Sequence, residues 1–282
     1  MFLNLWASAI GIRGVAFPEL ADLAKRHEFG GIDFDPAWAN GDVGRSRELG
    51  EELKGKGLQW GLFAMPGDFA AVDETKYDAM VARVKEIAPL AEAAGCTRTY
   101  NHVWPGHDKL PAAENRALHM KRLRPVVQIL ADHGVRYGLE FLGPFHLRDK
   151  AHVFLYRDEE MAELAEELGA GLVVDTFHWH CSGGTQESLT RAIRRVGVVN
   201  IHVNDARRGV PREAQLDHER ALPGATGEID AASFFAALRE IEYDGPVIAE
   251  PFQPEVGRLE KQPAEETAAE VAAALRSVVP VA

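Results

Sequence analysis

The sequence predicts an α/β fold of the (β/α)₈ or TIM-barrel type, formed as one domain by residues 1–282. Strand-like and helix-like patterns alternate from one end of the chain to the other, as a parallel barrel requires. The composition shows no break that would mark a second domain. No glycine-rich phosphate loop follows any strand, which disfavours nucleotide-binding versions of a doubly wound open sheet, the alternative architecture.

Eight apolar runs have the length and composition of buried parallel strands. In chain order these predicted strands are Phe2–Leu5, Gly31–Phe34, Gln59–Ala64, Thr97–His102, Arg136–Leu142, Gly171–Asp175, Val198–Val203 and Val247–Glu250.

Each predicted strand is followed by a stretch with apolar residues near positions i, i+3, i+4 and i+7, which is the pattern of an amphipathic helix. Glycines such as Gly95 and Gly169 follow these stretches where a helix C-terminus is expected. The longest irregular stretch, residues 209–227, follows the seventh strand, and long loops of this kind are often functional. The predicted helices are Glu19–His27, Arg45–Lys56, Tyr77–Ala94, Ala113–His133, Asp158–Leu168, Glu187–Val196, Ala231–Ile241 and Ala264–Val279.

Composition and charge restrict the function classes. The chain is 46% apolar and 26% charged, and no apolar run reaches the roughly 18 residues that span a membrane. A net charge of −12 disfavours nucleic acid as a partner, because that binding depends on neutralising phosphates. The N-terminus lacks the pattern of a signal peptide. Cys96 and Cys181 are the only cysteines, so we expect a reducing, cytoplasmic location without a disulfide framework.

Four consecutive predicted strands carry an acidic or imidazole side chain near their C-terminal ends: Glu140, Asp175, His202 and Glu250. Taken alone, each has an ordinary explanation, such as an ion pair or, for Asp175, a helix N-cap. The C-terminal ends of barrel strands meet at one face, however, so the four side chains can converge. Three carboxylates and one imidazole suit a single divalent cation, with Mn²⁺ preferred and Co²⁺, Mg²⁺, Fe²⁺ or Zn²⁺ as alternatives.

These residues resemble the xylose isomerase-like barrels, specifically the single-metal sugar epimerases and isomerases of the tagatose 3-epimerase and inosose-pathway type. The resemblance covers nearly the whole chain. It implies Glu140, Asp175, His202 and Glu250 as metal ligands, and His178 and Arg208 as contacts of the substrate. The motifs that carry it are Asp175-Thr176-Phe177-His178, His202-Val203-Asn204-Asp205, Pro223-Gly224 and Gly227-Glu228-Ile229-Asp230.

One position departs from the family pattern. The ketohexose epimerases carry a second glutamate six residues after the first ligand, where this chain has His146. We expect His146 and Trp104 to contact the substrate. His180 and Cys181 lie near His178 but lack a matching carboxylate for a second metal. Several further residues near strand ends could line the mouth of the barrel: Trp6, Asp35, Trp38, His102, His107 and Trp179.

The predicted function is a metal-dependent isomerase or epimerase of a small sugar or polyol-derived ketone. Glu140 and Glu250 would move a proton through a metal-bound enediolate. One alternative is a lyase on the same site, either inosose dehydratase-like or glycoside-eliminating. An apurinic endonuclease-like hydrolase would need three metals and a basic surface, and a non-enzymatic sugar-binding barrel would not need four ligands. The sequence leaves the substrate and a homo-oligomeric state open.

Overall fold

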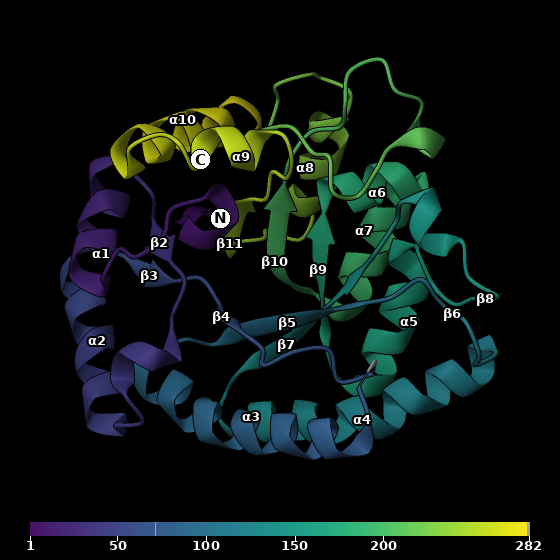
Figure 1. Cartoon of the computed structure of the whole chain (residues 1–282), viewed down its shortest axis with the longest axis horizontal. Helices are drawn as coiled ribbons and strands as arrows, with labels where there is room; N and C mark the ends of the chain where they lie inside the picture. The colour runs from purple at the N-terminus through teal and green to yellow at the C-terminus, as the bar shows by residue number, and fades with distance from the viewer. Residues whose placement is uncertain (71, 281–282) are drawn as a thin grey trace.

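The computed structural model describes residues 1–70 and 72–280, and its main sheet closes into a barrel (Figure 1). The strands pair in parallel in the order β3-β2-β1-β11-β10-β9-β7-β5-β4. The two outermost members, β3 (Gln59–Trp60) and β4 (Phe63–Ala64), are halves of one segment separated by two residues. That segment therefore joins β2 to β5 and closes a ring of eight strand positions, which confirms the (β/α)₈ fold.

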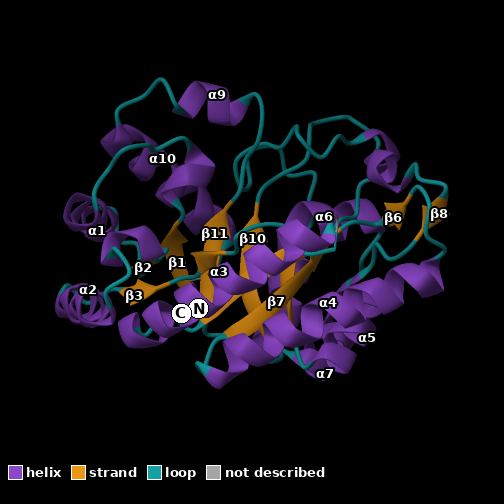
Figure 2. Ribbon diagram, turned by 60° about the horizontal axis from the view of Figure 1, so that its bottom comes forward, coloured by secondary structure: helices purple, strands orange, loops and turns teal. Residues whose placement is uncertain are grey.

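The remaining strands of the ring are β1 (Phe2–Leu5), β2 (Gly31–Ile32), β5 (Arg98–Val103), β7 (Arg136–Phe141), β9 (Gly171–Asp175), β10 (Val198–Val203) and β11 (Pro246–Ala249). The helices that cover it are α1 (Phe17–Arg26), α2 (Val43–Gly55), α3 (Glu74–Ala94), α4 (Ala112–Asp132), α5 (Asp158–Leu168), α7 (Gln186–Val196), α8 (Ala231–Arg239) and α10 (Ala264–Val278). In Figure 2 the strands lie at the centre and these helices lie around them.

Shorter elements lie in the loops that follow the strands. Helices α6 (Thr176–Ser182) and α9 (Glu255–Leu259) follow β9 and β11, and a small antiparallel pair, β6 (Gly106–His107) with β8 (His152–Val153), lies outside the barrel. The 3₁₀ turns are Ala7–Ile10, Pro36–Ala39, Phe145–Arg148 and Arg212–Ala214. No helix in the described part of the chain is long and apolar enough to cross a membrane.

The predicted elements are found, with shifted boundaries. The strands Phe2–Leu5, Gly171–Asp175 and Val198–Val203 have the predicted limits. Helix α3 begins three residues before the predicted start at Tyr77, because the Asp73 carboxylate accepts the Lys76 N–H at 2.9 Å and caps it. The predicted third strand is the one that splits. That residues 1–282 form a single domain stays a prediction.

The strands divide their side chains between two sides. In β10, Val198, Ile201 and Val203 belong to the apolar core. Asn200 and His202 alternate with Ile201 and Val203 along the strand and therefore lie on its other side. The whole strand is buried. The barrel interior therefore holds polar groups that are shielded from bulk solvent, and these groups need partners.

Candidate active site

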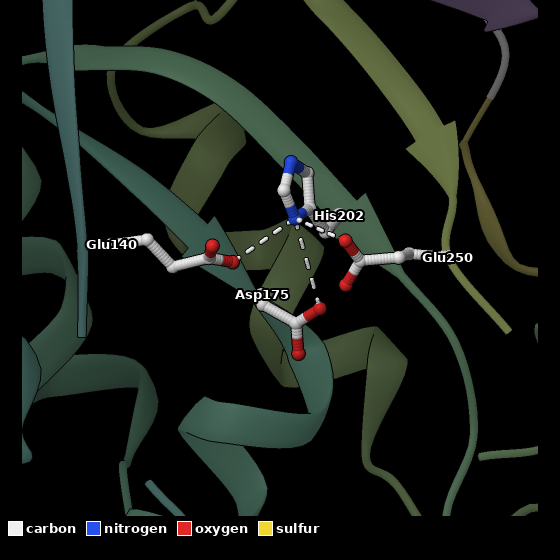
Figure 3. Close-up of side chains that lie close together, drawn as sticks. All are labelled: Glu140, Asp175, His202 and Glu250. Carbon is white, nitrogen blue, oxygen red and sulfur yellow. Dashed lines mark ion pairs between the residues drawn. The ribbon is translucent and has the colours of Figure 1, made fainter. Parts of the chain in front are cut away.

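Four side chains from neighbouring strands converge at the C-terminal end of the barrel (Figure 3): Glu140 in β7, Asp175 at the end of β9, His202 in β10 and Glu250 directly after β11. One ligand atom of each lies within 4.8 Å of the others, and all four residues are buried. His202 Nδ1 is 3.0 Å from Glu140 Oε1, 3.5 Å from Glu250 Oε1 and 4.0 Å from Asp175 Oδ2. The parallel register produces this convergence by setting His202 beside Asp175.

The electrostatics of the cluster call for a cation. Three buried carboxylates repel one another, and burial of charge without compensation is costly. His202 Nε2 makes no hydrogen bond within the described residues, and His202 Nδ1 faces Glu140 Oε1 at 3.0 Å without meeting hydrogen-bond geometry, so a cation between these atoms could take them as ligands. Oxygen and nitrogen donors in this ratio fit a divalent cation. The residues present therefore fit the metal that the sequence predicts.

The protonation of the cluster depends on its own charges. Burial raises the pKa of Asp175 to about 7, although the Arg220 guanidinium opposes this. Burial also acts to raise the pKa of Glu250, but His202 and Arg220 outweigh it and lower that pKa to about 2. For His202, the two glutamates outweigh burial and hold the pKa well above its ordinary value. A metal must therefore displace a proton from His202 at neutral pH, and its affinity should fall as the solution becomes more acidic.

Asp175 serves both as helix cap and as a member of the cluster. Its Oδ1 accepts the backbone N–H groups of Phe177 at 2.6 Å and His178 at 2.9 Å, which begins helix α6. Its Oδ2 faces the cluster and accepts the Asn204 amide at 2.8 Å. The capping explanation and the ligand explanation for Asp175 are thus compatible, because each uses a different oxygen.

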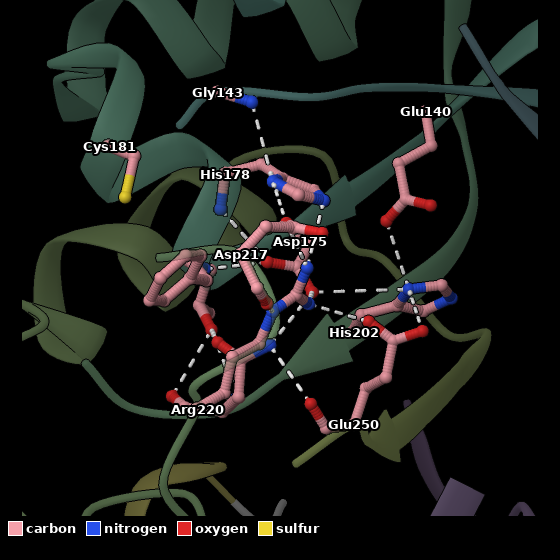
Figure 4. Close-up of polar contacts among 12 residues, drawn as sticks. Glu140, Gly143, Asp175, His178, Cys181, His202, Asp217, Arg220 and Glu250 are labelled. Atoms are coloured by element: carbon pink, nitrogen blue, oxygen red, sulfur yellow. Dashed lines mark hydrogen bonds and ion pairs between the residues drawn. The ribbon is translucent and has the colours of Figure 1, made fainter. Parts of the chain in front are cut away.

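Arg220, which no sequence pattern indicates, lies in the middle of the site (Figure 4). Its Nη1 donates to Glu250 Oε2 at 2.7 Å and to Asp175 Oδ2 at 3.1 Å. Its Nη2 donates to Asp217 Oδ1 at 2.7 Å and lies 3.2 Å from Nε2 of His178. Only 2% of the residue is exposed. Arg220 thus supplies a fixed positive charge beside two of the predicted ligands.

The long loop after β10 holds Arg220 in this position. Backbone bonds connect the loop to the barrel, from Ala221 N–H to Asp205 O at 2.8 Å and from Phe252 N–H to Arg220 O at 3.2 Å. The buried Asp205 carboxylate also accepts the N–H groups of Thr226 and Gly227. The length of this loop was the available signal for function. Nothing in its sequence distinguishes Arg220 from Arg212, which is also in the loop.

The predicted substrate contacts fall into two groups. His178 is buried on α6, where Gly143 N–H donates to its Nδ1 at 3.3 Å, and burial together with Arg220 keeps its pKa well below the ordinary value. Arg208 is exposed, and its guanidinium lies 3.3 Å from the carbonyl of Ala225. His146 and Trp104 are also exposed, and their rings pack beside His218 and His102 respectively. Roles for these four residues in binding substrate stay predictions.

We expect Arg220→Ala to lower kcat/KM by roughly 10- to 150-fold, since hydrogen bonds to charged groups contribute about 1.5–3 kcal/mol. Arg208→Ala should raise KM or lower kcat with metal content unchanged. Arg212→Ala, in the same loop but exposed, is the control. Steady-state kinetics and metal analysis would check this. Unchanged kinetics in Arg220→Ala would contradict a role in the site, and loss of metal or folding in Arg208→Ala would make Arg208 structural.

A cavity of about 730 Å³ adjoins the cluster on the side of β1, β2 and β5. Trp6 and Tyr100 line it, and their rings also pack on His202 at centroid distances of 5.7 and 5.0 Å. Of the residues expected near the mouth, Trp6, Asp35, Trp38 and His102 line this cavity. Trp179 instead packs against Phe234 in the core, and His107 Nδ1 accepts the N–H groups of Lys109 and Leu110.

A closed barrel with a buried carboxylate–imidazole cluster at the C-terminal ends of its strands defines the general class, a barrel equipped to bind a metal. The chain belongs to the xylose isomerase-like TIM barrel family, whose model matches residues 6–278. The resemblance inferred from the motifs is therefore confirmed.

Curated relatives of the chain are named isomerases and epimerases. The chain is 32% identical over 146 residues to the inosose isomerase of Bacillus subtilis (strain 168), a match that covers 52% of this chain and 50% of that protein. It is 30% identical over 198 residues to the L-ribulose 3-epimerase of Methylomonas sp. (strain DH-1), covering 66% of this chain and 63% of that protein. These matches thus span about half to two thirds of the relatives' lengths.

Solved structures share the fold along nearly the whole chain. The IolI protein with a bound zinc atom superposes with a TM-score of 0.80 at 22% identity, covering 99% of this chain and 98% of that one. The D-psicose 3-epimerase of Clostridium cellulolyticum H10, solved with D-tagatose, gives a TM-score of 0.71 at 16% identity and covers 100% of both chains. At these identities the likeness is one of fold.

Proposed function

We propose that this chain is a divalent-metal-dependent isomerase or epimerase of a small sugar or polyol-derived ketone. The observation that carries the proposal is the buried cluster of Glu140, Asp175, His202 and Glu250 beside a 730 Å³ cavity. Relatives named inosose isomerase and L-ribulose 3-epimerase support the same class of reaction.

The side chains have distinct parts in the proposed reaction. A cation held by the four ligands would act as a Lewis acid that makes the C–H beside a substrate carbonyl more acidic. Glu140 takes that proton, because its carboxylate has no arginine partner within the described residues. Glu250 is the weaker base, since Arg220 occupies its Oε2 and its pKa is lowered to about 2. Glu250 would instead return a proton from the opposite face or hold the substrate in place.

Arg220 and neutral His178 complete the arrangement. Arg220 fixes the orientation of the Glu250 carboxylate through the 2.7 Å hydrogen bond. His178 presents a neutral imidazole between the Gly143 N–H and the Arg220 guanidinium, and it would bind a substrate hydroxyl by exchanging one of these partners. Fixed donors that need no rearrangement during the reaction are the usual source of electrostatic stabilisation in enzymes.

The second candidate is a lyase on the same site, because proton removal beside a carbonyl can be followed by loss of a β-substituent. The isomerase is favoured by the names of the relatives. An apurinic endonuclease-like hydrolase fits less well, because the metal-binding group in the described residues is one four-residue cluster and the net charge is −12. Nucleic acid is therefore not proposed as a partner.

We further propose Mn²⁺ as the metal, on the basis of three oxygen donors and one nitrogen donor. The zinc atom in the IolI structure makes Zn²⁺ the first alternative.

Cys96 and Cys181 are both free and buried, which supports the expectation of a reducing, cytoplasmic location. A homo-oligomer stays a prediction for light scattering to test.

The proposed function is tested by loading metal-free protein with Mn²⁺, Zn²⁺, Co²⁺, Mg²⁺ or Fe²⁺ and assaying a panel of ketoses, inososes and their glycosides. We expect metal-dependent formation of an isomer or epimer of at least one ketone. Metal-dependent loss of water or of a glycosidic group would favour the lyase. No turnover with any metal would overturn both candidates.

A further inference from the structure

At the break in the third barrel strand, a backbone N–H donates to a side chain and not to a backbone carbonyl. Gly61 N–H and Phe34 N–H keep ladder bonds, to Ile32 O and to Leu62 O, each at 2.8 Å. The Leu62 N–H instead donates to the side chain of Asp33, at 3.1 Å from Oδ1. The same oxygen accepts the Asn4 amide from β1 at 2.6 Å. Asp33 and Asn4 therefore form a pair across the tops of two adjacent strands.

The surrounding backbone leaves room for this pair and for nothing larger. A Cβ atom at Gly61 would lie 2.5 Å from Asp33 Oδ1 and 2.4 Å from Asn4 Nδ2. A Cβ atom at Gly31 would lie 2.9 Å from Asn4 Oδ1. The close approach of the two polar side chains thus requires glycine at Gly61, whereas at Gly31 the nearest atoms are Gln59 O at 2.5 Å and Phe2 Cε2 at 2.6 Å.

Half of the hydrogen-bonding capacity of the pair is unused. Asp33 Oδ2 and Asn4 Oδ1 are buried and have no hydrogen-bond partner within the described residues. Buried polar atoms without partners are uncommon and usually have a functional or solvent explanation. Burial raises the pKa of Asp33 to about 7, opposed by the hydrogen bonds from Leu62 and Asn4. Near neutral pH the carboxyl can therefore either donate or accept.

Asp33 is connected to the cluster through the cavity and two aromatic rings. Asp33 lines the 730 Å³ cavity together with Trp6 and Tyr100, the two residues whose rings pack on His202. Strand β1, which carries Asn4, pairs with β11, after which Glu250 follows. Asp33 therefore lies on the cavity wall, and the cluster lies behind the Trp6 and Tyr100 rings that line the same cavity.

We propose that Asp33, held by Asn4, is a second anchor that binds a hydroxyl group of the substrate remote from the reacting carbon. This inference rests on the proposed function. A polyhydroxylated ring has C–H faces that can pack on Trp6 and hydroxyl groups that can face Asp33 while its carbonyl is directed toward the cluster. A turn of the Asp33 side chain would bring its buried Oδ2 to such a hydroxyl. One remote hydrogen bond fixes which carbon of such a ring is presented for reaction. Asp33 is thus assigned as a specificity-determining residue.

The test compares metal-loaded wild type with Asp33→Asn, which keeps the shape of the side chain. The matched control is Asp42→Asn, since the Asp42 carboxylate also accepts one backbone N–H, from Arg45 at 3.0 Å, but is exposed at the start of α2. Kinetics use a ketone that the wild type converts, and binding uses myo-inositol, an unreactive cyclic polyol, followed by tryptophan fluorescence. Metal content is measured in parallel.

We expect Asp33→Asn to raise KM and the Kd for myo-inositol by roughly 10- to 100-fold, the effect of one hydrogen bond to a charged group, with metal content unchanged. Asp42→Asn should stay within about twofold, the range of an ordinary surface change. In a series of deoxy-inositols, the penalty should disappear for the analogue that lacks the anchored hydroxyl. A merely structural Asp33 would penalise every analogue equally, and this result would overturn the anchor.

Asn4→Ser provides the second variant, because it removes the amide that holds Asp33 and leaves the carboxylate in place. It should reproduce the same pattern with a smaller penalty, and an unchanged Kd in both variants would overturn the proposal. Turnover in the wild type with no effect of Asp33→Asn rejects the anchor alone. Binding of myo-inositol that depends on Asp33, without turnover of any ketone, rejects the proposed function alone. Absence of both binding and turnover in the wild type rejects both.

Discussion

Asp175→Asn is expected to lose metal and activity together. The substitution keeps the shape of the side chain but replaces one carboxylate oxygen by an amide nitrogen that cannot bind a cation. Removing a residue that only supports a ligand typically costs 10–100-fold in metal affinity, so loss of a direct ligand should exceed about 100-fold. His202→Ala and Glu250→Gln should behave alike, because one ligand atom of each lies within the same 4.8 Å group. The measurement is metal per chain after dialysis, with kcat/KM on the same samples.

Two controls make this result specific. Glu213→Gln changes an exposed carboxylate that pairs with Arg212 and should keep full metal content. Circular dichroism distinguishes loss of metal from loss of fold, which matters because Asp175 Oδ1 also caps α6. Asparagine retains one oxygen for that cap. Full metal occupancy in all three ligand variants would contradict the assigned cluster.

Glu140→Gln is expected to abolish both turnover and exchange of the substrate C–H proton with solvent. General acid–base catalysis contributes roughly 10²–10⁴-fold, so kcat should fall by about that factor. With metal added until the weakened site is loaded, Glu250→Gln should also be slow, but it should still exchange the proton, because Glu140 remains as a base and Arg220 already occupies Glu250 Oε2 at 2.7 Å. Reactions run in D₂O and read by NMR would measure both quantities.

The wild type supplies the reference for this comparison. Proton removal by a carboxylate should place deuterium at the reacting carbon of the product, and recovered substrate carries deuterium where return of the proton is faster than release. Product formed in D₂O without deuterium would favour hydride transfer or a single base shielded from solvent. The two-glutamate mechanism would then fail even with the metal site established.

The fold was predictable because its determinants are local. Apolar runs such as Gly171–Val174 and the amphipathic stretch that became α5 have periodicities that do not depend on distant residues. The four cluster residues were predictable for a related reason. Each lies within one residue of the C-terminal end of a strand, and a parallel barrel brings all such ends to one face. Knowledge of the barrel was therefore sufficient to bring Glu140, Asp175, His202 and Glu250 together.

The tertiary structure decided what depends on loops and on contacts between strands. Arg220 reaches Asp175 and Glu250 only because backbone bonds fold its loop onto β10 and the segment after β11, and no local pattern encodes that path. Arg208, the substrate contact that the family resemblance implies, is exposed. In the sequence, nothing distinguishes Asp33 from other acidic residues near the end of a predicted strand. Its hydrogen bonds to Asn4 and Leu62 arise from pairing between segments about 29 residues apart, which the sequence does not specify without the closed barrel.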